Sequence, residues 1–145
     1  MSDGKNHKFG YEMVEHTADI ALRVNAEILP EIYQFAAMGL CDLLVGIDHV
    51  STSYSERIEV QGNDLEDLLV RMLSELIFRF STRHLIFRQF IIEYLNHEKL
   101  ILLAQGEAFD STRHPLQQEI KAATYHGLEI QPTDDGFTAT VVFDV

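Results

Sequence analysis

Two clusters of oxygen-bearing groups, one near each end of the sequence, could do chemistry. The segment His16-Thr17-Ala18-Asp19 precedes an alternating apolar stretch, so Asp19 could present a carboxylate ligand at the start of a strand. Thr and Asp also hydrogen-bond to nearby backbone, so an ordinary turn is the alternative. The sequence ends in Phe143-Asp144-Val145, where a side-chain carboxylate adjoins the chain-end carboxylate. If the two clusters meet, their carboxylates repel unless a hard cation such as Ca²⁺ or Mg²⁺ neutralises them.

A third group of chemically capable residues lies in the segment KAATYHGL, residues 121–128. Strand alternation would place Lys121 and Tyr125 on one face, with Thr124 and His126 on the other. Lys121 could contact a phosphate or a carboxylate as a point charge, although most lysines are simply solvated. His126 could serve at a site, although a partly buried, hydrogen-bonded histidine is the alternative. The residues alone leave both alternatives open.

Other common catalytic patterns are absent from the sequence. It contains no GxxxxGK(S/T) phosphate loop, no GxSxG, no HExxH and no paired CxxC. The single cysteine, Cys41, falls among apolar residues of a predicted helix, and we interpret it as a packing residue. His84 and His114 lie in predicted loops and carry no spacing signal.

Composition and charge restrict the class of protein. The chain has 145 residues, of which 46% are hydrophobic, so one domain can bury a core without disulfides. Its 23 acidic and 11 basic residues give a net charge of −12. An acidic surface disfavours direct binding to nucleic acid and favours a cation or a basic partner protein.

The sequence also predicts how the chain is organised. We expect a disordered tail at residues 1–10 and a single domain at residues 11–145, with no internal repeat and no linker. There is no signal-peptide pattern, and the apolar runs are too short to span a bilayer. We therefore expect a soluble cytoplasmic protein that does not bind membranes.

Apolar periodicity predicts the elements that must position the three groups. One helix should begin at Pro30 and end at Gly46, and a second should follow the cap Asn63, with Glu66 completing a capping box. Strands are predicted at residues 11–15, 20–24, 58–60, 86–95, 100–108, 120–130 and 137–144. This order predicts the α+β class: a two-layer α/β sandwich with a mostly antiparallel sheet and two helices on one face.

Five segments, in order along the chain, resemble the signature motifs of one known family. They are HTAD at residues 16–19, GNDLEDLLVRMLSELIFRF at 62–80, EAFD and RH at 107–110 and 113–114, EIKAATYH at 119–126, and VFDV at 142–145. Each motif is weak alone, but five in register are specific. From residue 11 to residue 145 the sequence resembles the archease family.

The resemblance implies a function as an accessory protein and not as an enzyme. Archeases assist the RtcB-type RNA ligase, which joins tRNA halves after intron removal. They promote guanylylation of that ligase and support its multiple turnover. The implied partner is therefore this ligase, with no direct contact to nucleic acid, and the implied state is a monomer or a weak oligomer.

The resemblance also implies a metal site and residues for activation. A divalent cation, with Ca²⁺ expected and Mg²⁺ or Mn²⁺ as alternatives, would be held by Asp19, Asp144 and Val145. Lys121 matches a position important for activation, and His16 and His126 of the same motifs are assigned to contact with the partner.

One departure from the family pattern and two alternative functions remain. Met72 stands where the second-helix motif usually carries Trp; it falls on the predicted apolar face, so we expect the change to affect packing alone. A stand-alone metal-dependent hydrolase could use Asp19, Asp144 and His126. The other alternative is a general chaperone, or a modulator of proteins that process nucleic acid.

Overall fold

The computed structural model describes residues 9–15 and 19–145, so most of the predicted disordered tail lies outside the described residues. The elements in chain order are β1 (Gly10–Glu15), β2 (Ile20–Ala26), α2 (Leu29–Val45), the 3₁₀ helix η1 (Ile47–His49), β3 (Tyr54–Gln61), α3 (Leu65–Arg83), β4 (Leu85–Leu95), β5 (Lys99–Ala108), β6 (Ala122–Ala123), β7 (Gln131–Thr133) and β8 (Gly136–Asp144). Among these described residues, neither α-helix is long and apolar enough to cross a membrane.

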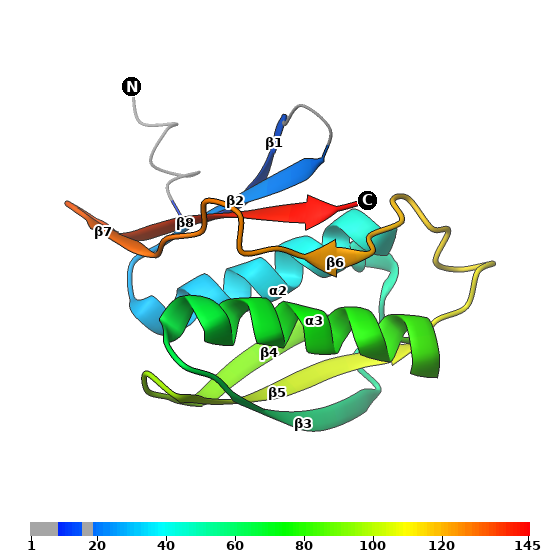
Figure 1. Cartoon of the computed structure of the whole chain (residues 1–145). Coiled ribbons are helices and arrows are strands. Elements are labelled where there is room, and N and C mark those ends of the chain that lie inside the picture. Colours follow the sequence, from blue (N-terminus) through cyan, green and yellow to red (C-terminus); the bar gives the residue numbers. More distant parts are fainter. Residues whose placement is uncertain (1–8, 16–18) are drawn as a thin grey trace.

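The predicted α+β class is confirmed, and the strands form two antiparallel sheets. One sheet has the order β1-β2-β8-β6, with β7 also paired to β8, and the other has the order β3-β5-β4. Figure 1 shows α2 and α3 between these two sheets. The helix α2 contacts β2 in the first sheet and β4 in the second. Sequence periodicity had predicted one sheet, because alternation within a strand does not say which sheet the strand joins.

The helix α2 is buried over most of its circumference, which suits its place between two sheets. Its buried residues include Ile32, Tyr33, Ala36, Leu40 and Cys41, so the interpretation of Cys41 as a packing residue is confirmed. Pro30 lies in the first turn, where a missing N–H costs little. Gly46 ends the helix with φ of 75°, a left-handed conformation that glycine adopts without a steric penalty.

The cap of α3 differs from the prediction. Asp64, and not Asn63, is the cap, since its Oδ1 accepts from the Asp67 N–H at 2.8 Å. Asp67 in turn accepts from the Asn63 N–H at 2.9 Å, a role that the prediction gave to Glu66. Met72 is fully buried on this helix, as its place on the apolar face predicted.

The predicted strand at residues 120–130 is wrong for most of its length. Only Ala122–Ala123 pair with β8, as β6. Gly127 has φ of 62°, and the Leu128 N–H donates to the Tyr125 carbonyl at 3.1 Å, so the chain turns there. The hairpin onto β8 is instead made by the short strand β7. Because no strand runs through Tyr125 and His126, the predicted division of this segment into two faces does not hold.

Candidate functional site

The two ends of the domain lie side by side where β2 begins and β8 ends. The antiparallel register pairs Ile20 with Phe143. Asp19 directly precedes Ile20 and Asp144 directly follows Phe143, so both acidic residues lie where this pair of strands ends. The structure therefore brings together Asp19 and Asp144, the two acidic residues that the sequence singled out.

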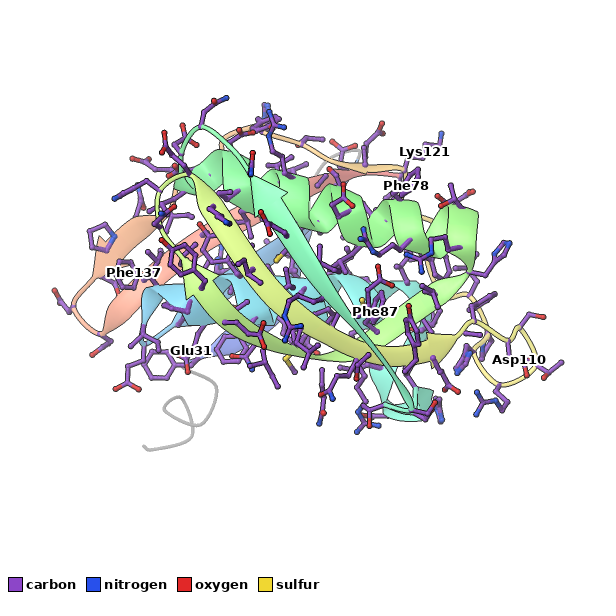
Figure 2. All side chains as sticks on the ribbon, turned by 90° about the horizontal axis from the view of Figure 1, so that it is seen from below. Glu31, Phe78, Phe87, Asp110, Lys121 and Phe137 are labelled. Carbon is purple, nitrogen blue, oxygen red and sulfur yellow. The ribbon has the colours of Figure 1, made fainter. Side chains whose placement is uncertain are left out.

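The segment that carries Lys121 lies on the other side of Asp144. The Lys121 N–H donates to the Asp144 carbonyl at 2.8 Å, and Ala122 pairs with Asp144 in the sheet. Thr124 continues this attachment, since its N–H and its Oγ1 both bond to the Val142 carbonyl, at 3.0 and 2.8 Å. The Lys121 side chain is exposed and projects from the molecule beside α3, as Figure 2 shows. The end of β8 thus has an acidic residue on one side and a lysine on the other. We call this group, Asp19, Lys121, Asp144 and Val145, the C-terminal edge.

The other predicted site residues are placed differently. His16 lies outside the described residues. The His126 side chain is exposed, so the alternative that it is a partly buried histidine is wrong. The His126 main-chain N–H donates to Thr124 Oγ1 at 3.4 Å. Val145 is partly buried and packs against the core, which fixes the end of the described chain.

The oxygen atoms at the C-terminal edge are the type of ligand that a hard cation prefers. Within residues 9–15 and 19–145, no group of three or more His, Cys, Asp or Glu side chains is arranged to hold a metal ion. Side chains at this edge supply two carboxylates, and the remaining oxygen ligands would come from the main chain at Val145 and from water. Such an oxygen-only set is typical of Ca²⁺ and Mg²⁺ sites.

A second polar cluster, which sequence reasoning did not single out, is built around His114. This side chain is fully buried, and its Nδ1 accepts from the Asp110 N–H at 2.9 Å. Its Nε2 lies 2.8 Å from Glu107 Oε2. Glu107 also accepts from the Ser51 N–H at 2.7 Å and from Arg113. The cluster joins the end of β5 to the loop that leads to Lys121.

Hydrogen bonding determines the charge state of Glu107. Burial raises the pKa of this carboxyl, but the bonds from Ser51, Arg113 and His114 outweigh burial and lower the pKa to about 2. Glu107 is therefore a carboxylate at neutral pH. The motif resemblance over residues 107–114 was the one signal that could have pointed to this cluster.

The segment after β6 is attached to the first turn of α3. The Tyr125 hydroxyl donates to Asp67, and the Ile130 N–H donates to Glu66 Oε2 at 2.9 Å. The bond from Tyr125, followed by that from Asn63, lowers the pKa of Asp67. These contacts fix the residues that follow β6, although they form no strand.

Comparison with known proteins decides the family. Residues 11–145 match the model of the family described as Archease protein family (MTH1598/TM1083). The chain belongs to the archease family. It is 35% identical over 139 residues to protein archease of Methanosarcina mazei, covering 93% of this chain and 95% of that one. Protein archease of Methanopyrus kandleri is 36% identical over 138 residues, with 93% and 99% covered.

Two solved archease structures share the fold. The solution structure of Methanobacterium thermoautotrophicum protein 1598 superposes with a TM-score of 0.80 at 28% identity, covering 94% of this chain and 99% of that chain. The crystal structure of an archease from Thermotoga maritima, described as a possible chaperone, has a TM-score of 0.62 at 21% identity, with 92% and 96% covered. The second likeness supports the α+β fold alone.

Proposed function

We propose that this archease is an accessory protein that activates an RtcB-type tRNA-splicing RNA ligase. It would promote guanylylation of the ligase and support multiple turnover, with a divalent cation held at the C-terminal edge. One observation supports this proposal: the register of β2 and β8 pairs Ile20 with Phe143, the chain neighbours of Asp19 and Asp144, and the main chain of Lys121 is bonded to Asp144.

This arrangement suits work at a nucleotide-binding site in another protein. Carboxylate oxygens are the ligands that hard cations prefer, so Asp19 and Asp144 would hold such a cation against the edge of the sheet. A bound cation supplies stabilisation of the negative charge that develops in nucleotidyl transfer. Lys121 has an exposed side chain, and its main-chain N–H is bonded to Asp144; its ammonium group would contact a phosphate or an acidic group of the ligase.

The attachment of this edge to paired strands suits a role in which it is presented to a partner protein. Asp19 and Asp144 adjoin paired strands, and Lys121 is joined by its main chain to the end of β8. A tip held in this way can enter a partner's active site without losing much conformational entropy. The net charge of −12 favours contact with a basic protein and disfavours direct contact with RNA.

The proposal is tested by ligation of an RNA that carries a 3′-phosphate, using far less ligase than RNA. Addition of this protein should raise the number of turnovers and the fraction of guanylylated ligase. Equal turnover with and without the protein would contradict the proposal. Protection of unrelated proteins from aggregation in the absence of ligase would instead favour a general chaperone; the Thermotoga maritima protein is described as a possible chaperone.

A further inference from the structure

A cavity of about 610 Å³ opens between the β1–β2 hairpin and the C-terminal end of α2. Tyr11 and Met13 line it from β1, Leu22 lines it from β2, and Asp42 and Leu43 line it from α2. The loop before β6 completes the wall and is fixed there, because the Gln117 N–H donates to the Leu44 carbonyl at 2.7 Å. The function proposed above makes no use of this cavity.

The charged groups of the cavity are acidic. Glu12, Asp42 and Asp48 line it, and none of its described lining residues is Lys or Arg. Glu12 is partly compensated by Arg23, which lies 3.9 Å away at the surface. Asp42 is held in place by the Tyr11 hydroxyl at 3.1 Å and by the Ile47 N–H at 3.0 Å. The last turn of α2 carries no basic residue, so the negative end of the helix dipole adds to the same potential.

The remaining walls are apolar, and this determines what kind of cation fits. Ile20, Leu22 and Leu43 line the cavity, and Met13 lies at its edge with 63% of its surface exposed. A lysine or arginine side chain combines a long apolar stem with a charged head, and so matches a cavity with apolar walls and carboxylates. The volume exceeds that of one side chain, which favours a short segment of a protein over a single metal ion.

The cavity adjoins the C-terminal edge. Ile20 lines the cavity and directly follows Asp19, and it pairs with Phe143, which directly precedes Asp144. A protein that contacts Asp19 and Asp144 would therefore also lie close to the cavity. We infer that the cavity receives an arginine or lysine side chain, with its neighbouring residues, from a basic segment of the ligase. This inference rests on the proposed function and adds a docking site to it.

The test compares two variants with the same change in net charge. Asp48→Lys places a positive charge at the cavity, whereas Asp134→Lys places it in the turn between β7 and β8; both side chains are exposed. In a binding titration with the ligase, Asp48→Lys should weaken affinity about tenfold or more, while Asp134→Lys should change it much less. Met13→Trp should also weaken binding, because the larger side chain would fill the cavity without changing the charge. Equal affinities of Asp48→Lys and Asp134→Lys for the ligase would overturn the docking site. If both variants still stimulate the ligase, the proposed function would stand.

A second measurement does not depend on the ligase. Acetyl-arginine amide, titrated into the isotope-labelled protein, should shift the amide resonances of Met13 and Leu43, and acetyl-glutamate amide should not. Absence of these shifts would overturn the docking site even if the ligase is stimulated. Larger shifts from spermidine than from the arginine derivative would assign the cavity to a free polyamine and overturn it as well. Failure of the wild-type protein to stimulate the ligase, together with normal arginine shifts, would overturn only the proposed function.

Discussion

The Nε2 atom of His114 lies 2.8 Å from Oε2 of Glu107, and the histidine side chain has no exposed surface. Because Nδ1 accepts the Asp110 N–H, the ring proton must be on Nε2, where it is donated to Glu107. Figure 2 shows Asp110 in the loop at the end of the molecule. The pair therefore holds the start of the loop that leads to Lys121, and its effect on function would be one of positioning.

Replacement of His114 by Ala should destabilise the fold. The variant loses a fully buried ring and the bonds that this ring makes with Glu107 and with the Asp110 N–H. We expect a loss of about 2–4 kcal/mol in the free energy of unfolding, measured by urea titration. His97→Ala is the matched control, because His97 is exposed in the turn between β4 and β5. Equal stability of the two variants would show that the buried pair does not stabilise the fold.

Stability should depend on acidic pH through Glu107. Its pKa is lowered from 4.5 to about 2 in the folded protein, so at intermediate pH the unfolded chain binds more protons than the folded one. The contribution of Glu107 is therefore fully present above the unfolded pKa and is lost as the pH falls through the folded pKa. The difference in unfolding free energy between the wild type and Glu107→Gln should shrink from about pH 5 to about pH 2. A difference that stays constant over this range would contradict the assignment.

The regular elements were predictable because they depend on local patterns. Amphipathic periodicity located both helices, β2 and the β4–β5 hairpin, where Asn96 Oδ1 accepts from the Glu98 and Lys99 N–H groups at 2.9 and 2.8 Å. The sequence raised the meeting of Asp19 with Asp144 only as a condition for a cation site, and the assignment of both residues as metal ligands stays a prediction.

What the sequence could not predict depends on contacts between distant residues. The segment after Ala123 leaves the sheet because side chains of α3 satisfy its polar groups, through Glu66 with Ile130 and Asp67 with Tyr125. Strand alternation contains no information about such partners. Glu107 lies near the end of β5, and His114 follows seven residues later in an irregular loop, so no periodic pattern connects them.

The cap of α3 can be tested with two neighbouring substitutions. Asp64→Ala removes the carboxylate that accepts the Asp67 N–H, and should lower the free energy of unfolding by about 1 kcal/mol. Asn63→Ala retains the main-chain N–H that Asp67 accepts, and should change stability much less. Urea unfolding of both variants decides between them. A larger loss for Asn63→Ala would restore Asn63 as the cap.

Asp144→Asn should weaken cation binding while the fold remains. The substitution leaves Asp19 as the one side-chain carboxylate of the proposed cation site, so affinity for Ca²⁺ measured by calorimetry should fall about tenfold or more. A ligand that binds only the folded state stabilises it, so Ca²⁺ should raise the melting temperature of the wild type. A chelator should reverse this rise. Neither effect is expected in the variant at the same Ca²⁺ concentration. Without Ca²⁺ the variant should be as stable as the wild type or slightly more stable, since a repulsion between like charges is removed.

The same variant separates cation binding from ligase activation. Asp134→Asn is the matched control, since it removes one acidic charge in the turn between β7 and β8 and should leave both Ca²⁺ binding and ligase stimulation unchanged. Asp144→Asn should reduce multiple-turnover ligation along with Ca²⁺ affinity, because the proposed function needs the cation at the tip that enters the ligase. Normal stimulation by an Asp144→Asn protein that no longer binds Ca²⁺ would refute that mechanism. The contribution of the C-terminal edge would then have to come from Lys121, and Lys121→Ala would become the decisive variant.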